Sequence, residues 1–140
     1  MTHEQFITLE TAKLAKQARF DWEVNSYLSY YGNCPDNPHW AVSVNQEYRD
    51  WNNYKFKHIP EAYSCPTQSV LQRWLREVKG MYIEITHTIT DEFYVTIHSK
   101  NFIVTKHVLT ENGQTLTFPT YEAALESGEQ KWLTLLIENQ

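Results

Sequence analysis

The sequence is short of the residues and patterns that several functional classes require. It has only 4 glycines, and it contains no Gly-rich phosphate loop, no Gly-x-Ser-x-Gly and no His-Glu-x-x-His. Such motifs depend on glycine at tight backbone approaches or on histidines at helical spacing. No apolar run approaches the ~20 residues of a membrane-spanning helix. We therefore expect a protein that is not an enzyme, has no cofactor and has no membrane partner.

Positive charge and cysteine are also scarce. The chain has 12 Lys and Arg against 17 Asp and Glu, a net charge of −5, so general attraction to nucleic-acid phosphate is not expected. The start of the chain, Met1 to Gln5, lacks the basic and apolar segments of a signal peptide. A cytoplasmic location follows as an expectation, with Cys34 and Cys65 as reduced thiols rather than a disulfide.

Aromatic residues, in contrast, are abundant. They make up 14% of the 140 residues, which is a suitable length for a single domain, 1–140, with one core. The rings concentrate between Phe20 and Tyr63. Disordered chains are poor in aromatic residues, so we interpret residues 21–63 as an ordered, irregular excursion pinned by its rings.

The most decisive stretch is the amphipathic helix predicted over residues 66–79. Its apolar residues have the spacing of one helical face: Val70, Leu71, Trp74, Leu75 and Val78. Thr67 is a suitable N-cap, and Gly80 is a suitable stop because glycine adopts the left-handed conformation that ends helices. The pattern predicts that Trp74 is buried and that this helix lies on a sheet formed by the residues that follow.

Two further helices are predicted by capping threonines. Thr8 begins one, with Leu9, Ala12, Ala15 and Phe20 on its buried face. Thr120 begins the last, which continues to about Ile137. Its predicted buried face consists of Tyr121, Ala124, Leu125, Gly128, Trp132, Leu135 and Leu136.

Alternation of apolar and polar residues predicts an antiparallel meander of about four strands. The strands are 81–89, 93–98, 102–109 and 115–118. A loop of residues 90–92 would pair Ile89 with Phe93, Ile85 with Ile97 and Glu84 with His98. Asn112-Gly113 predicts a type I′ turn that pairs Leu109 with Leu116 and His107 with Phe118. A further strand is predicted to begin within 20–24, and 40–44 fits a short strand or a helical turn.

The predicted fold class is therefore α+β. Three helices pack on one face of a small antiparallel sheet, and the aromatic-rich irregular excursion lies between the first two helices.

Three segments, residues 8–16, 65–77 and 120–128, have a familiar wording, and its specific part is Pro-Thr-Gln-Ser-x-Leu-Gln-x-Trp-Leu-Arg-Glu within 66–77. Together they resemble a family of short uncharacterised proteins from Bacteroidetes genomes, phages and prophages. The resemblance implies a small phage-type accessory protein, with no catalytic residue to assign.

The aromatic segment is the leading candidate for a binding surface. Tyrosine and tryptophan supply rigid contact area and concentrate in interface hot spots, so a protein partner is the first hypothesis. The candidate residues are Tyr31, Trp40, Trp51, Tyr54, Arg73 and Arg76. The alternative interpretation is that most of the rings fill a second small core.

Nucleic acid remains the second hypothesis for a partner. Arg73, Arg76 and Lys79 form a basic stripe on one predicted helix, and Lys13, Lys16 and Arg19 form another. If the two stripes adjoin, they would suit a phosphate backbone despite the acidic total. Exposed edge strands also allow a homodimer.

Two weaker chemical sites are also considered. Glu84 opposite His98 would orient an imidazole for acid–base chemistry, or else form an ordinary cross-strand pair. Cys34, His39, His58 and Cys65 offer thiol and imidazole ligands of the kinds that zinc prefers. Their spacings are looser than those of zinc fingers, so we predict no metal site.

Overall fold

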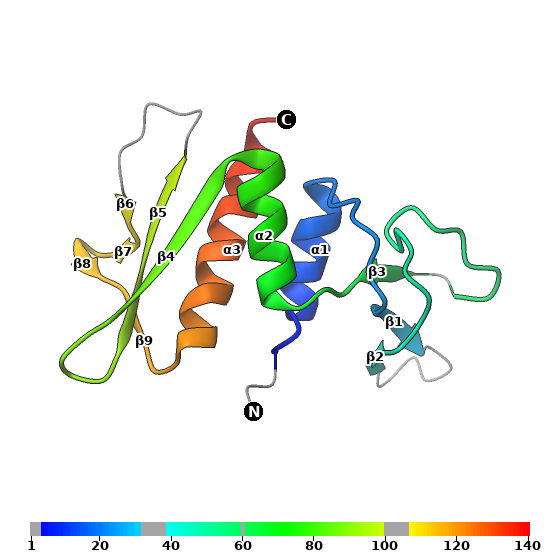
Figure 1. The fold of residues 1–140 in the computed structure, drawn as a ribbon, viewed down its shortest axis with the longest axis horizontal. Helices are drawn as coiled ribbons and strands as arrows, with labels where there is room; N and C mark the ends of the chain where they lie inside the picture. Colours follow the sequence, from blue (N-terminus) through cyan, green and yellow to red (C-terminus); the bar gives the residue numbers. More distant parts are fainter. Residues whose placement is uncertain (1–3, 32–38, 60, 100–106) are drawn as a thin grey trace.

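The three helices of the protein lie in a layer between two antiparallel sheets (Figure 1). The structure is a computed structural model and describes residues 4–31, 39–59, 61–99 and 107–140, with the backbone alone for Tyr31, His39 and His107. The α+β class predicted from the sequence is confirmed. Among the described residues, none of the helices combines the length and the apolar character needed to cross a membrane.

Each helix begins where a threonine caps it. In α1 (Leu9–Gln17), α2 (Gln68–Lys79) and α3 (Tyr121–Glu138), the side chains of Thr8, Thr67 and Thr120 accept a backbone N–H three residues later. Gly80 ends α2 in the left-handed conformation, at φ 66°. The helices run in the same direction, so their N-termini lie at one end of the layer (Figure 1).

Trp74 of α2 lies at the centre of the core, as predicted. Its side chain is 1% exposed, and Phe20 meets its ring edge to face at 5.2 Å. Val78, predicted on the same buried face, is instead 50% exposed. It belongs to the last turn of the helix, one residue before Lys79 and the stop at Gly80.

The large sheet packs against α3. Its strands are β4 (Met81–His87), β5 (Phe93–Ser99), β6 (His107–Val108) and β9 (Thr117–Phe118). The predicted close approach at Gly128 is present, because a Cβ there would lie 2.9 Å from Ile83 and from Val95. The strand order differs from a simple meander, since β6 and β9 both pair with β5. Residues 102–106 of the predicted third strand lie outside the described residues.

The predicted register between β4 and β5 is wrong by two residues. Ile85 pairs with Val95, and the turn closes at Thr88, whose N–H donates to the carbonyl of Glu92 at 2.8 Å. Asp91 adopts a positive φ of 63° inside this turn. Ile89 therefore belongs to the loop and is fully exposed, although its apolar character continued the alternation.

The hairpin at Asn112-Gly113 is confirmed in part. Both residues have positive φ, and β7 (Thr110–Glu111) pairs with β8 (Gln114–Thr115). The N–H of Leu116 donates to the carbonyl of Leu109 at 3.0 Å, as predicted. The continuation of this pairing is wrong, because Phe118 pairs with Phe93 and His107 pairs with Ile97.

The aromatic segment is more regular than the sequence predicted. It forms a small sheet in the order β2-β1-β3, from β1 (Tyr27–Tyr31), β2 (His39–Ser43) and β3 (Ala62–Ser64). The strand expected within 20–24 is absent there, where only Val24 forms an isolated bridge, to Arg49. The small sheet occupies the opposite end of the molecule from the large one (Figure 1).

Candidate functional site

The aromatic rings of the small sheet divide between its two faces. Register places Leu28, Tyr30, Trp40, Val42 and Tyr63 on one face. Tyr27, Ser29, Ala62 and Ser64 lie on the other. Each face therefore has its own set of neighbours.

The face with Tyr27 forms a second small core. Trp51 lies 4.7 Å from the Tyr27 ring and stacks on Phe56 at 5.6 Å, with Tyr54 at 5.2 Å. Trp51 is 6% exposed, and its indole N–H donates to the carbonyl of Val24 at 2.7 Å. Trp51, predicted as a binding residue, thus holds the loop of residues 46–59 on the sheet.

The other face carries the strongest candidate for a binding surface, which we call the aromatic–lysine patch. It consists of Tyr30, Trp40 and Tyr63 from the sheet with Lys13 and Lys16 from α1. Trp40 lies 5.5 Å from Tyr30 and 5.6 Å from Tyr63. The ammonium groups of Lys13 and Lys16 lie 5.5 Å and 5.2 Å from the ring centroids of Trp40 and Tyr63.

The patch is held in place by polar contacts. Lys16 Nζ also donates to the carbonyl of Ala62 at 3.3 Å. The hydroxyl of Tyr63 donates to the carboxylate of Glu61. Burial, with Glu61 as the second cause, raises the pKa of Tyr63 to about 12, so the phenol keeps its proton at neutral pH.

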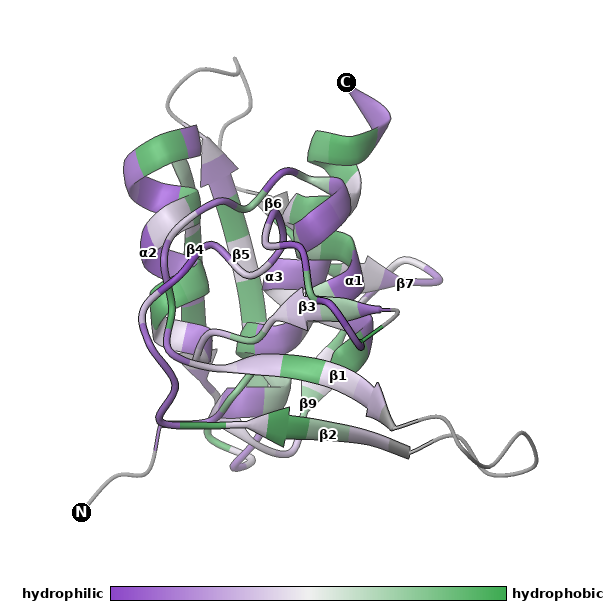
Figure 2. Cartoon of the chain, turned by 90° about the vertical axis from the view of Figure 1, so that its right-hand side faces the viewer, coloured by the Kyte–Doolittle hydropathy of each residue, from purple (hydrophilic) through white to green (hydrophobic). Residues whose placement is uncertain are grey.

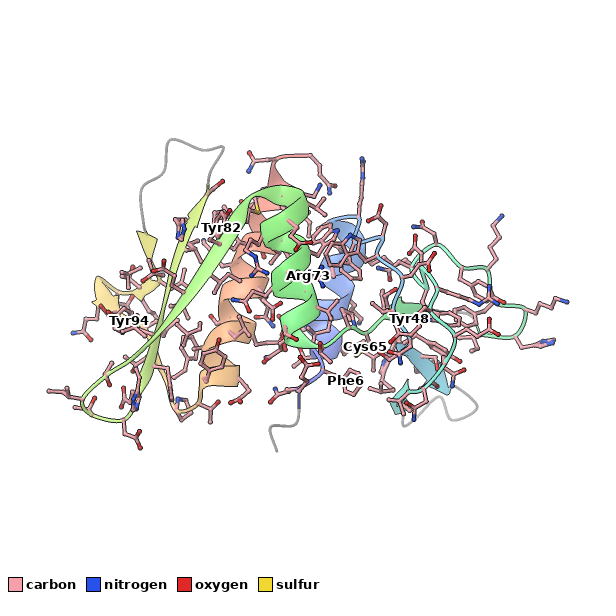
Figure 3. The ribbon with its side chains drawn as sticks, viewed as in Figure 1. Phe6, Tyr48, Cys65, Arg73, Tyr82 and Tyr94 are labelled. Carbon is pink, nitrogen blue, oxygen red and sulfur yellow. The ribbon has the colours of Figure 1, made fainter. Side chains whose placement is uncertain are left out.

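Exposed apolar residues and a hollow lie at the same end of the molecule as the patch. Val42, Val44 and Tyr48 are 40%, 45% and 67% exposed. Figure 3 labels Tyr48 among the side chains at the small-sheet end of the molecule. A hollow of about 390 Å³ adjoins Lys16, and its other lining residues are Tyr54, Lys55, Phe56, Ile59, Glu61 and Ala62.

The remaining predicted binding residues lie elsewhere or already have neighbours. Tyr54 is 44% exposed, and the guanidinium of Arg49 lies 5.3 Å from its ring. Arg73 donates to Glu77 at 3.0 Å, and its guanidinium lies 5.8 Å from the Trp22 ring. Arg76 is exposed on α2. Tyr31 lies in β1, but its side chain is outside the described residues.

The two basic stripes therefore have different surroundings. Lys13 and Lys16 contact rings of the small sheet, whereas Arg73 contacts its own helix and Trp22. The continuous basic surface that a nucleic-acid backbone would favour is not supported by these contacts.

The predicted pairing of Glu84 with His98 is wrong, because the register is shifted. Glu84 is opposite Thr96, and His98 is opposite Tyr82. The rings of His98 and Tyr82 stack at 4.9 Å with 6° between their planes. The imidazole thus packs on a phenol ring, on the face of the large sheet opposite the one where Ile83 and Val95 meet α3.

The cysteine and histidine candidates do not form a metal site within the described residues. Within these residues, no group of three or more His, Cys, Asp or Glu side chains has the arrangement of a metal centre. Cys65 is fully buried, and burial raises the pKa of its thiol to about 12. His58 is exposed, while Cys34 and the side chain of His39 lie outside the described residues.

Sequence reasoning missed a pair of buried carboxyls on α3. Glu126 is 8% exposed and accepts the N–H of Thr8 at 3.0 Å. Glu129 is fully buried, and neither of its carboxylate oxygens has a hydrogen-bond partner among the residues that the structure describes. Burial raises the pKa of both groups, that of Glu129 well above its ordinary value. Glutamate is rarely buried alone, so no periodic pattern would have identified them.

Comparison with known proteins adds no assignment. Neither models of protein families nor curated protein sequences match the chain, and no solved structure matches its fold.

Proposed function

We propose that the protein is a non-enzymatic accessory protein of the phage or prophage type. In this proposal it acts in the bacterial cytoplasm by binding an acidic segment of another protein through the aromatic–lysine patch. The observation that carries the proposal is the placement of the Lys13 and Lys16 ammonium groups over the rings of Trp40 and Tyr63.

The composition of the patch supports a protein partner. Half-buried aromatic rings provide contact area that loses little conformational entropy on binding. Lysines beside them attract a carboxylate and set the orientation of the partner. Lys55 adds a third cation at the adjoining hollow, against the single carboxylate of Glu61.

The buried carboxyls support a role other than catalysis. Strongly shifted pKa values often mark active sites, where the group lines a cleft. Glu129 is instead fully enclosed in the helical layer, so no substrate reaches it in this conformation. The perturbed group and the accessible hollow beside Lys16 are therefore different places.

Binding of single-stranded nucleic acid is the second candidate, because rings beside lysines can stack on bases. The ring contacts favour the first candidate. Trp40 already has Tyr30, Tyr63 and Lys13 as neighbours, which leaves less of its ring for stacking on a base.

The test is affinity capture from a Bacteroidetes lysate with the wild type and two variants. The double variant Lys13→Glu/Lys16→Glu reverses the charge of the patch, and Lys131→Glu is the control because it changes an exposed lysine of α3. We expect a partner that the wild type and the control retain and the double variant loses. A partner retained equally by all three proteins would refute the role of the patch.

A gel-shift titration with single-stranded oligonucleotides separates the two candidates. Binding driven by phosphate contacts weakens steeply with salt. A salt-sensitive shift that the double variant abolishes would favour nucleic acid over a protein partner.

A further inference from the structure

The free edge of the small sheet lies beside the aromatic–lysine patch. Strand β2 is the outer strand in the order β2-β1-β3, and Figure 2 shows it along the outside of that sheet. An edge strand presents N–H and C=O groups that another strand can pair with. The inference below rests on the geometry of this edge strand and does not depend on the proposed function.

Among the described residues, strand β2 has none of the features that usually block an edge. Residues 39–44 contain no Lys, Arg, Asp, Glu or Pro, and Val42 and Val44 are 40% and 45% exposed. Charged side chains, proline and covering elements are the common protections of such strands. By contrast, side chains of helices already bond to the outer strand of the large sheet. Gln72 and Trp132 donate to the carbonyls of Ile83 and Tyr82 in β4.

We propose that β2 pairs antiparallel with β2 of a second copy of this chain, with the two-fold axis through Ala41. The two small sheets then form one continuous six-stranded antiparallel sheet across the dimer.

The register follows from the length and pattern of the strand. Ala41 is the midpoint of the five residues His39–Ser43, so a two-fold axis there pairs every residue of the strand. Trp40 then lies opposite Val42 of the second copy, and Val42 opposite its Trp40. Aromatic and β-branched residues are favourable cross-strand partners. A closed two-fold contact also uses the same surface on both subunits.

The absence of charge in β2 favours a second copy as its partner. Residues 39–44 contain no acidic or basic side chain, so no like charges face each other when two copies of this strand pair.

The dimer would join the two aromatic–lysine patches on one face. Directly opposed residues share a face of a sheet, so the Trp40 rings of both copies lie on the same side. One five-residue strand forms a small interface, so the dimer is expected to be weak and concentration-dependent.

Sedimentation equilibrium over roughly two decades of concentration, extending above the micromolar range, is the first test. We expect the wild type to shift from monomer to dimer and Val42→Lys to remain monomeric. Val78→Lys is the matched control, since Val78 is also an exposed valine but lies in the last turn of α2, outside the small sheet. A monomeric wild type at the highest concentration, or a dimeric Val42→Lys, would overturn the proposal.

Cysteine cross-linking tests the register without perturbing the edge. In a background with Cys34→Ser, Ala41→Cys places two thiols across the axis, within the Cα separation of ~4.5–5.5 Å of directly opposed residues. Ser43→Cys places its thiol opposite His39 instead. We expect a covalent dimer to form at least tenfold faster with Ala41→Cys. Equal rates, or faster reaction of Ser43→Cys, would overturn the axis at Ala41.

Discussion

The two sheets of this protein are held by different means. In the large sheet, apolar side chains of Ile83 and Val95 meet α3 at Gly128. The small sheet and its loop are held by hydrogen bonds from side chains to the backbone, as at Asn52 and Trp51. Apolar alternation is visible in a sequence, whereas single polar anchors are not. The difference explains why the strands of the large sheet could be predicted in outline, whereas in the small sheet the sequence indicated only a short strand or helical turn over 40–44.

Removing Trp74 should disrupt both sheets at once, because its ring lies in the helical layer between them. We expect Trp74→Ala to lower the free energy of unfolding by about 3–5 kcal/mol, the usual cost of a large core truncation. Urea denaturation measures this change. Tyr48→Ala, at a ring that is 67% exposed, is the control and should change stability by less than about 0.5 kcal/mol.

Asn52→Ala should destabilise the small sheet more than the large one. Asn52 accepts the N–H of Ser64 at 2.8 Å and donates to the carbonyl of Phe20 at 2.9 Å. Its loss leaves two backbone groups without partners, at a cost of about 2–4 kcal/mol. Hydrogen exchange should show the loss first in β1 and β3.

Gln72→Ala is the matched change at the large sheet. Its amide donates to the carbonyl of Ile83 at 3.3 Å, a longer single bond. We expect a loss of about 1 kcal/mol or less. If Asn52 and Gln72 contribute equally, the contrast between polar anchors and apolar packing is wrong.

Glu129→Leu should stabilise the protein at neutral pH by about 1–3 kcal/mol, because it removes a buried carboxyl that has no hydrogen-bond partner in the described part of the chain. Burial, then Glu126, raises the pKa of Glu129 well above its ordinary value of 4.5. The folded state therefore keeps a proton that the unfolded chain releases, and stability falls as pH rises above that ordinary value. Thermal melting across pH should show a weaker fall in Glu129→Leu than in the wild type. Glu122→Leu, at an exposed position of α3, should leave the slope unchanged.

The smallest expected effect is at the surface of α2. Arg73 and Glu77 form an exposed pair at helical spacing, 3.0 Å apart. Glu77→Ala should cost about 0.2–0.5 kcal/mol, and salt should reduce that difference. A loss well above this range in urea denaturation would mean that Arg73 also anchors Trp22.

The sequence predicted the helix ends and one hairpin turn, which depend on residues close together in the chain. Three threonine caps, Gly80 and the Asn112-Gly113 turn all act within a few residues of chain. The β4–β5 register failed because Ile89 continued the apolar pattern although Asp91 and Thr88 had already formed the turn. Alternation of apolar and polar residues thus predicted the wrong end for the strand, because the turn residues determine where β4 ends.

The candidate site was less predictable than the fold. Trp40 was identified from aromatic density, but Trp51 belonged to the small core. The sequence predicts Lys13 and Lys16 only as part of a basic stripe that would suit nucleic acid, because their ring neighbours come from strands far along the chain. Tyr121, predicted to be buried, is 45% exposed, while Glu129 takes an interior position that hydropathy assigns to apolar residues.

The first helix of the chain is fastened by the last. Thr8 donates to Glu126, Thr11 accepts from Gln130, and the carbonyl of Gln17 accepts from Gln140. During translation, α1 leaves the ribosome long before these partners exist. The contacts between α1 and α3 can therefore form only after α3 has been synthesised, and a nascent protein stopped before α3 would expose the apolar face of the large sheet to chaperones and proteases.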